Sequence, residues 1–312
     1  WAAASDLENA IQGAGFHINP AKTRMQFRTS RQLVTGLTVN AKVNIRAEYY
    51  RRARAMCHEL FETGAYYRPG STGASGINKD SPEVAEPERI TSLGPLEGIL
   101  SHIHHIKTTI NRRGERSKKK DATAERKLYA RFLKYRYFVR LEFPLIVCEG
   151  KTDNIYLKYA IRNLTDFHPK LGSWEGETFI SAVTLFNYTN KAHRILDLDG
   201  GASHLNYFFV KGRYKKDIDK FKHRPLKKPV VIFIDNDDGS AGIFSTLKDN
   251  YKIVIDWESD ESFFHVTDNL YLVKTPAKGA DHKSCIEDFF DPSVLKTKIG
   301  GKKFNPKSKP GS

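Results

Sequence analysis

Cysteine is scarce in this sequence, and no cysteine lies in a metal-ligand pattern. The 312 residues include 3 cysteines, Cys57, Cys148 and Cys285, separated by long stretches of chain. An odd number of isolated cysteines argues against a disulfide framework and against a structural zinc site. The histidines do not form a His-Glu-x-x-His motif either. These absences exclude the disulfide-rich secreted class, and we expect a protein of the reducing cytoplasm.

Long apolar runs are absent as well. No stretch approaches the roughly 18 consecutive apolar residues of a membrane span, and no signal peptide opens the chain. We therefore expect no membrane partner. The chain opens on Trp1 and closes on residues 309–312 without the capping or tail signals of a natural end. These ends favour a fragment of a longer protein.

Acidic residues are outnumbered by basic ones. The chain has 51 lysines and arginines against 36 aspartates and glutamates, a formal net charge of +15. Such an excess favours a polyanion as partner, and nucleic acid is the leading candidate. The length allows two domains, the 39% hydrophobic content is compatible with buried cores, and a homo-oligomer stays open.

A short apolar run in the middle of the chain ends abruptly in charged residues. Residues 145–148 are uniformly apolar, which is typical of a strand buried on both faces, and helical periodicity begins at Thr152. Glu149 therefore lies at the carboxyl end of a predicted central strand, where open α/β sheets bind their ligands. Gly150 allows a sharp turn, and Thr152 or Asp153 can cap the following helix.

A second run of this kind, residues 229–234, ends in Asp235, Asn236 and Asp237. Two parallel strands joined through helical sequence would bring Glu149, Asp235 and Asp237 to one edge of a sheet. Carboxylates gathered in this way repel one another unless a cation lies among them. Because all the ligands are oxygen atoms, Mg²⁺ or Mn²⁺ is favoured over zinc.

Further residues around this edge are candidates for the same site. Lys151, at the helix start beside the carboxylates, can bind a phosphate group, and Asp153 can complete a second metal position.

Residues 194–202 form a further predicted strand that ends at small residues. Gly200 and Gly201 would let the turn after it approach the metal edge closely. Asp197 and Asp199 lie on or near this strand and are weaker candidates for the metal site. We also expect a strand at residues 269–273.

The glutamate and aspartate pattern resembles the TOPRIM domain of topoisomerases, bacterial primases and related nucleases. The signature of that family is Glu-Gly after one strand and Asp-x-Asp after a later one. The resemblance implies a Rossmann-like, mostly parallel sheet in residues 144–312, truncated at its C-terminus. Because related nucleases hold a second metal with an acidic pair near this point, it also implies that role for Glu287 and Asp288. Capping of the turn at residues 286–290 by Ser284 or an acidic residue is an equal alternative. Topoisomerase action needs a tyrosine from a separate domain and primase action needs template-binding modules. Neither is evident, so hydrolysis of nucleic acid is the remaining enzymatic interpretation.

The first third of the chain has a different pattern. Residues 5–15 are predicted to form an amphipathic helix, 25–27 and 32–37 strands, and 49–61 a basic helix. The runs GFHINPAKTR, RQLVTGLTVN and LGPLEGILSHIHHI resemble the end of the palm and the thumb of bacterial retron reverse transcriptases. The Tyr-x-Asp-Asp polymerase motif of that family is absent from the sequence, so this chain is not expected to copy RNA. Some retron reverse transcriptases carry a C-terminal TOPRIM domain, and the order of motifs here is similar.

The resemblance defines the expected architecture and partners. The fold class is α/β, with a mainly helical thumb and a short palm remnant in residues 1–110, a basic connecting segment and helix in 111–143, and the TOPRIM domain in 144–312. The implied partners are the retron noncoding RNA and its multicopy single-stranded DNA (msDNA), beside a nucleic-acid substrate. The residues expected to bind nucleic acid are Val34, Thr35, Gly36, Arg51, Arg52, Arg54, Arg112, Arg113, Lys118, Lys119 and Lys120.

The stretch between these parts is less specific. Residues 112–120 are either a solvated linker or a phosphate contact. Residues 125–140 predict a helix with Leu128, Phe132, Tyr135 and Val139 inward and its arginines and lysine outward as possible phosphate contacts.

Two functional hypotheses follow. In the first, the protein is a toxin-like effector of antiphage defence whose TOPRIM half is a Mg²⁺-dependent nuclease. Asp235 and Asp237 would hold the metal, and Glu149 would bind metal or act as general acid and base. In the second, the chain is a binding module that holds the retron RNA and msDNA, with a silent scaffold or partner-docking surface in its second half.

Overall fold

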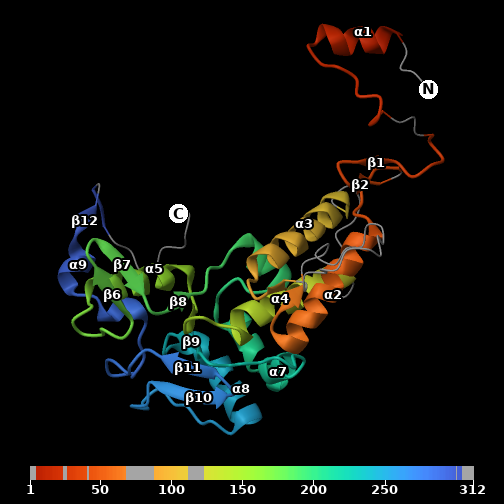
Figure 1. Ribbon diagram of the computed structural model, residues 1–312. Helices are drawn as coiled ribbons and strands as arrows, with labels where there is room; N and C mark the ends of the chain where they lie inside the picture. The colour runs from red at the N-terminus through yellow and green to blue at the C-terminus, as the bar shows by residue number, and fades with distance from the viewer. Residues whose placement is uncertain are drawn as a thin grey trace. The chain divides into compact units, whose positions relative to one another are not determined.

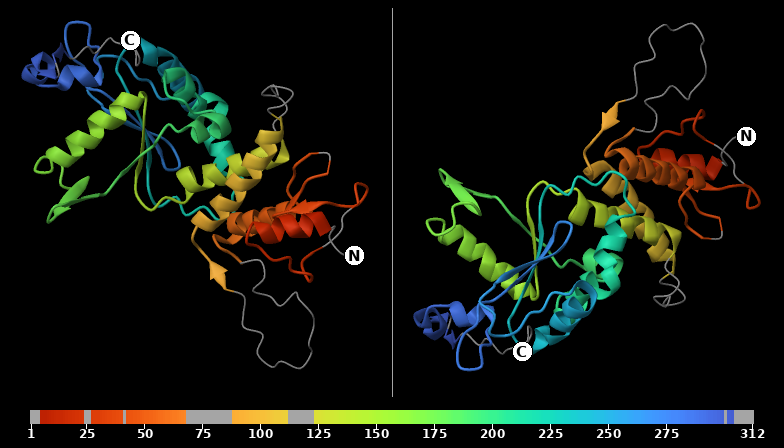
Figure 2. Two further views of the ribbon diagram at one scale, coloured as in Figure 1. Left: turned by 90° about the horizontal axis from the view of Figure 1, so that it is seen from above. Right: turned by 90° about the horizontal axis from the view of Figure 1, so that it is seen from below.

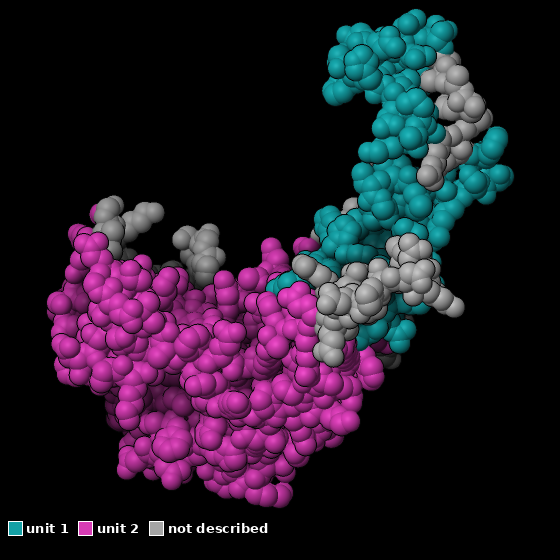
Figure 3. Space-filling model, in the orientation of Figure 1, with its two compact units in different colours: residues 1–56, 94–125 teal, residues 57–93, 126–312 magenta. Residues whose placement is uncertain are grey.

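The computed structural model describes residues 5–23, 27–40, 42–67, 88–111, 123–299 and 301–303. The chain divides into two compact units, which Figure 3 shows in different colours. Unit 1 contains residues 1–56 and 94–125, and unit 2 contains residues 57–93 and 126–312. The division falls inside helix α2 (Ala47–Thr63) and beside the start of helix α4 (Ala124–Lys134).

Unit 1 contains helix α1 (Ser5–Gly13), the first part of α2, helix α3 (Gly94–Asn111) and a small hairpin of β1 (Leu33–Val34) and β2 (Leu37–Thr38). The predicted N-terminal helix is confirmed. The predicted strand at residues 32–37 is wrong in one respect, because it is interrupted by a turn. Thr35 and Gly36 both have positive φ, 49° and 84°, which is the backbone of the tight two-residue hairpin turn.

The basic helix α2 is amphipathic in the way its sequence predicts. Ala53 and Met56 are buried, whereas Arg51, Arg52 and Arg54 are exposed. On α3, the buried side chains of Leu96, Leu100 and Ile103 recur at helical spacing. Within unit 1 the ring of Tyr49 meets the ring of His102 edge to face, with centroids 6.2 Å apart.

Unit 2 is organised around a five-stranded sheet in the order β10-β11-β9-β5-β8. The parallel strands are β5 (Leu145–Cys148), β8 (Thr184–Leu185), β9 (Val230–Ile234) and β11 (Leu270–Lys274), and only β10 (Phe263–Thr267) runs antiparallel. The three predicted strands at 145–148, 229–234 and 269–273 are confirmed. The described chain is therefore mixed α/β with a mostly parallel sheet.

Helices flank this sheet on both sides (Figures 1 and 2). Helix α5 (Lys151–Asn163) follows β5, and helix α8 (Ala241–Tyr251) follows β9. Helices α6 (Ala202–Leu205) and α7 (Arg213–Ile218) lie on the same side as α8. The core between α8 and the sheet includes Ile232, Ile234, Leu247 and Leu272, all fully buried.

Smaller elements complete unit 2. They are β3 (Tyr66–Tyr67), β4 (Arg89–Ile90), β6 (Gly172–Glu175), β7 (Thr178–Ser181), α9 (Pro292–Lys296), β12 (Lys298–Ile299) and β13 (Lys302–Lys303). No helix within the described ranges is long and apolar enough to cross a membrane.

The predicted helix at residues 125–140 is confirmed as α4 followed by a π-helical turn at Tyr135–Val139. Phe132, Tyr135 and Val139 are buried as expected. The expectation that the cationic side chains point outward is wrong for three of them, because they bind other parts of unit 2. Arg126 donates to the Arg194 carbonyl and Arg131 to the Lys220 carbonyl.

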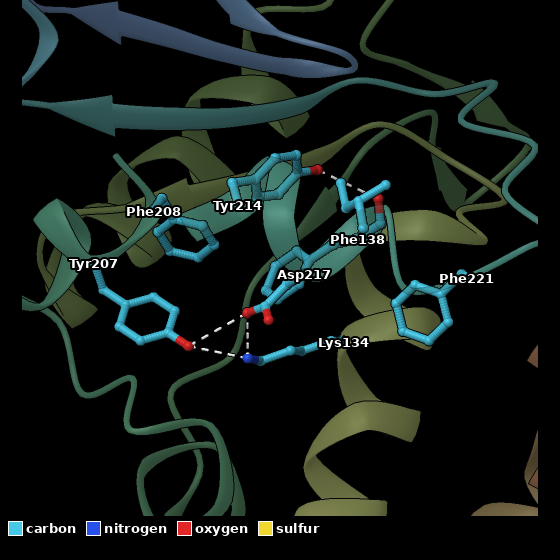
Figure 4. Close-up of a pocket in the computed structure, with 8 residues that line it drawn as sticks. Lys134, Phe138, Tyr207, Phe208, Tyr214, Asp217 and Phe221 are labelled. Carbon is cyan, nitrogen blue, oxygen red and sulfur yellow. Dashed lines mark hydrogen bonds and ion pairs between the residues drawn. The ribbon is translucent and has the colours of Figure 1, made fainter. Parts of the chain in front are cut away.

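The third of these cations, Lys134, is part of a small polar group beside an aromatic cavity (Figure 4). Its ammonium forms an ion pair with Asp217 and donates to the Tyr207 hydroxyl at 2.9 Å. Burial alone would lower the pKa of Lys134, but these hydrogen bonds raise it above its ordinary value. The cavity beside it, about 20 Å³, has room for a single water molecule.

The predicted strand at residues 194–202 is wrong. Residues Ala192–Leu196 form a π-helical turn that ends at Asp197, which has the left-handed φ of 59°. Gly200 and Gly201 follow, each with φ of 84°. The buried residues Ile195 and Leu196 belong to this turn. The prediction failed because a two-residue apolar run fits a short helical turn as well as a strand.

Candidate functional site

Glu149 and Asp235 immediately follow neighbouring parallel strands. Cys148, the last residue of β5, is paired in register with Phe233 of β9. Both strands therefore end at the same edge of the sheet, and the two carboxylates leave it side by side. The predicted convergence of Glu149 and Asp235 is confirmed.

Glu149 is half-buried among negative charge. Burial raises the pKa of its carboxyl above the ordinary value, and the charges of Asp237 and Asp153 raise it further, while backbone N–H groups of Asp235 and Ala202 act in the opposite direction. One of its oxygens, Oε2, is buried and has no hydrogen-bond partner among the described residues. A buried carboxylate oxygen without a partner is costly, since it has lost its hydration without compensation.

Asp235 is perturbed more strongly. Burial, followed by the charges of Asp153 and Glu149, raises its pKa from 3.8 to about 7. The backbone N–H of Ile286 donates to its Oδ1 at 3.0 Å and partly offsets this effect. The carboxyl therefore changes its charge near neutral pH.

Asp237 lies at the same edge and shapes the loop that follows β9. Its Oδ1 accepts a hydrogen bond from the Gly239 N–H at 2.9 Å, which caps a short 3₁₀ turn before α8. A Cβ atom on Gly239 would lie 3.0 Å from that oxygen and 3.7 Å from Glu149 Oε1. The two carboxylates thus approach one point in space, and Gly239 leaves the room between them.

Asp153 is buried, with 6% of its surface exposed. Its Oδ2 accepts a hydrogen bond from the Gly150 N–H at 2.6 Å, so it closes the first turn of α5 from the third helical position. Its charge acts on both Glu149 and Asp235. The capping prediction for Asp153 is confirmed, and its role as a metal ligand stays a prediction.

The turn at Gly200 and Gly201 does approach this edge. The Gly201 N–H donates to the Glu149 carbonyl at 2.7 Å, and a Cβ atom on Gly200 would lie 2.9 Å from the same carbonyl oxygen. The Tyr188 hydroxyl donates to the Cys148 carbonyl one residue earlier. The predicted close approach is confirmed, although it comes from a helical turn rather than a strand.

Lys151 is bound to an aspartate outside the carboxylate group. Its Nζ lies 3.1 Å from Asp199 Oδ1, and its side chain is 60% exposed. The hydrogen bond from Lys151 lowers the pKa of Asp199. The weaker candidate Asp197 pairs with Arg126 at 3.5 Å. Phosphate binding by Lys151 stays a prediction, and the ammonium group has further N–H donors beside the one that binds Asp199.

Glu287 and Asp288 lie in the 3₁₀ turn Ile286–Phe289. Asp288 Oδ2 accepts from the Cys285 N–H at 2.8 Å, so the capping alternative is present, supplied by Asp288 rather than by Ser284. Glu287 faces Tyr156, whose pKa is raised first by burial and then by the charge of Glu287. The metal-binding role of the two acids is untested.

Sequence reasoning missed two residues at this edge. Asn236 is fully buried, and its side-chain amide donates to the carbonyls of Trp257 and His282 at 3.0 and 2.8 Å, which ties the surrounding loops to β9. Lys283 pairs with Asp238 at 2.6 Å, and Asp237 is among the charges that raise its pKa. Neither residue has a motif signal, since both act through distant segments of the chain.

The residues predicted to bind nucleic acid divide into two groups. Thr35 and Gly36 form the tip of the β1–β2 hairpin, and Val34 beside them is 55% exposed. Arg51, Arg52 and Arg54 share the exposed surface of α2. The second group lies outside the described residues and comprises Arg112, Arg113, Lys118, Lys119 and Lys120.

The chemistry of the carboxylate edge suits a hard cation, although a ligand set is not preassembled. Among the residues that the structure describes, no three Asp, Glu, His or Cys side chains are arranged to share one metal ion. Burial and the neighbouring negative charges raise the pKa of Asp235, and Glu149 Oε2 is buried without a hydrogen-bond partner among the described residues. Mg²⁺ or Mn²⁺ bound by these oxygens would relieve both. No protein-family model and no solved structure matches this chain.

Proposed function

We propose that the chain is the C-terminal part of a retron reverse transcriptase fused to a TOPRIM-type nuclease that acts as an effector in antiphage defence. The nuclease would hydrolyse phosphodiester bonds in nucleic acid with Mg²⁺ or Mn²⁺. The observation that carries the enzymatic half is the partly desolvated carboxylate pair Glu149 and Asp235 at the ends of two neighbouring parallel strands. Burial raises both pKa values, and neighbouring carboxylates raise them further, because Asp153 and Glu149 act on Asp235 while Asp237 and Asp153 act on Glu149. A purely structural sheet edge does not require such a group of acids.

In this proposal each carboxylate has a distinct task. Asp235 and Asp237 would hold the metal, which when bound would stabilise the charge that develops on a phosphate oxygen. Glu149 would act as general acid and base, because a raised pKa brings its proton exchange closer to neutral pH. Asp153, Glu287 and Asp288 would support a second metal position. Lys151, which pairs with Asp199, and Lys283, which pairs with Asp238, would orient the scissile phosphate.

The nucleic-acid-binding half of the proposal rests on charge and exposure. The net charge of +15 and the exposed arginines of α2 favour contact with the phosphate backbone. The retron noncoding RNA and msDNA are the proposed partners. Contact with the turn of the β1–β2 hairpin would position the RNA without reading its bases.

A second candidate function is a binding scaffold without catalysis. The hydrogen bonds of Asp153, Asp237 and Asp288 to nearby backbone N–H groups favour it, because each shapes a loop without any metal. Glu149 differs in one atom: backbone N–H groups of Asp235 and Ala202 act on its carboxyl, but its buried Oε2 has no hydrogen-bond partner among the described residues, which favours the metal-dependent function.

The deciding experiment incubates the protein with labelled single-stranded RNA, transfer RNA, single-stranded DNA and duplex DNA, in Mg²⁺, in Mn²⁺ and in EDTA. We expect cleavage that EDTA and Glu149→Gln abolish and that Asp249→Asn, an exposed change on α8, leaves intact. Cleavage that survives Glu149→Gln would place the active site elsewhere. Absence of cleavage in every arm, with RNA binding retained, would favour the scaffold.

A further inference from the structure

Unit 2 contains a cleft of about 520 Å³ far from the carboxylate edge. Residues 140–142, just before β5, and residues 223–227, just before β9, line it. It therefore lies at the amino ends of the two central strands, whereas the carboxylates follow their carboxyl ends. With four residues in β5 at about 3.3 Å each, the two sites are separated by roughly 13 Å along the strands. The cleft is large enough for a nucleotide-sized ligand.

The lining of this cleft is strongly basic. Arg89, Arg140, His223 and Lys227 contribute to it, and Glu142 is the one acidic residue among the lining side chains. No carboxylate of a described residue lies within 4.0 Å of any of these four basic groups. Arg89, Arg140 and Lys227 therefore gather positive charge without a close ion-pair partner among the described residues, and the His223 ring lies beside them.

Hydrogen bonds fix the side chains that line the cleft. His223 Nδ1 lies 2.6 Å from the Tyr135 hydroxyl, and its backbone N–H donates to the Phe61 carbonyl at 2.9 Å. Arg140 donates through Nη1 to the Gly64 carbonyl at 3.1 Å. Gly64 has φ of 82°, and a Cβ atom there would lie 2.5 Å from the His223 ring. The imidazole is thus seated against a glycine, with its position fixed from three sides.

We propose that this cleft binds a phosphate group, carried either by a free nucleotide or by the end of an oligonucleotide. Arginine offers paired N–H donors that match phosphate oxygens, and the neighbouring lysine and histidine add further donors on the same cleft. Such a site is separate from metal-dependent cleavage, because its cations attract a phosphate without any metal.

The histidine links this binding to pH. Burial lowers the pKa of His223, and the charges of Arg140, Arg89 and Lys227 lower it further. A bound phosphate reverses the electrostatic part of this effect, so the ring takes up a proton on binding. The other titratable groups that face the ring are Tyr135, through its hydroxyl, and Glu142 in the cleft lining. Affinity for phosphate should therefore increase as pH falls from about 8 toward 6.

The test measures binding of adenosine 5′-monophosphate by titration calorimetry in EDTA, where no divalent metal takes part. The double variant Arg89→Gln/Lys227→Gln removes two exposed cations of the cleft. The control Lys158→Gln/Lys170→Gln removes the same charge from exposed positions outside it. We expect the first variant to bind at least about tenfold more weakly than wild type and the control to bind like wild type. Equal affinity in the two variants would overturn the proposal, and matching melting temperatures would show that both fold.

Two further arms identify the source and the proton. If a ten-nucleotide RNA with a 5′-phosphate binds more tightly than the same RNA with a 5′-hydroxyl, the ligand is the end of a nucleic acid. If adenosine 5′-monophosphate binds more tightly than either RNA, the ligand is a free nucleotide. His223→Gln should make the affinity less dependent on pH than it is in the wild type. The phosphate of the ligand also titrates, but it does so equally with both proteins, so the difference between them reports on the ring. If the pH dependence of both proteins is the same, the ring does not contact the phosphate. Failure of the cleavage experiments would leave these results unaffected, because they are measured without metal.

Discussion

Replacing Asp235 by Asn should stabilise this protein at high pH and in EDTA, which is the reverse of what most core-edge substitutions do. The carboxyl is half-buried near Asp153 and Glu149, and its pKa is raised to about 7. At pH values between 3.8, the ordinary pKa of the carboxyl, and about 7, the folded protein holds a proton on Asp235 that the unfolded chain has lost. Stability therefore falls as pH rises through this window, and the full cost of the ionised group is reached above it.

The size of the effect follows from the same numbers. A pKa of about 7 against 3.8 corresponds to at most about 4 kcal/mol of differential free energy. Because the carboxyl is only partly shielded from solvent, we expect about half of this, roughly 2 kcal/mol. Asparagine keeps an oxygen that can accept the hydrogen bond from the Ile286 N–H, so the loop contact is preserved.

Urea unfolding at pH 5 and pH 8 in EDTA measures this difference. Trp257, whose carbonyl accepts from Asn236, reports on the same edge by fluorescence. We expect Asp235→Asn to gain about 2 kcal/mol at pH 8 and less than half of that at pH 5, which lies in the lower part of the window above 3.8. We also expect it to lose the stabilisation that Mg²⁺ is expected to give the wild type. Asp249→Asn should change neither. An equal loss of stability at both pH values would show that Asp235 is a structural cap and that the electrostatic reasoning is wrong.

Three other substitutions test separate parts of the structure. Gly200→Ala should lower the free energy of unfolding by about 2 kcal/mol more than Gly201→Ala, because both glycines have φ of 84° but only the first would place Cβ 2.9 Å from the Glu149 carbonyl; equal losses would rule out the close approach. Lys134→Met should cost about 2 kcal/mol, because it leaves the Asp217 carboxylate with the exposed Lys220 and the Tyr207 hydroxyl as its remaining partners, and adding Asp217→Leu should recover much of this loss in chemical denaturation. If the double variant is less stable than the single one, the pair is not a buried charge pair of this kind. Reversing the charge of Arg51, Arg52 and Arg54 on α2 should weaken binding to the cognate RNA. The slope of log affinity against log salt concentration should fall by about 0.7–0.9 per lost phosphate contact, which filter binding at several salt concentrations measures. An unchanged slope would exclude α2 from the interface.

The sequence by itself determined the two central strands and the carboxylates that end them. Residues 145–148 and 230–234 are apolar and β-branched over lengths that a buried parallel strand needs, and the acids that follow mark where each strand must stop. Helical periodicity likewise located α1, α2 and α4 to within a few residues. These are local signals, because hydrophobic pattern and turn chemistry act over a few neighbouring positions.

Only the tertiary structure decided what those residues do to one another. The pKa of Asp235 is raised first by burial and then by the charges of Asp153 on α5 and Glu149 after β5, which the fold brings close to the end of β9. Lys134 was expected to face solvent, but the fold supplies Asp217 and Tyr207 as partners. The basic cleft has no sequence motif, since Arg89, Arg140 and His223 come from three distant segments. Charge and burial act through space, so their consequences depend on contacts that the order of residues does not contain.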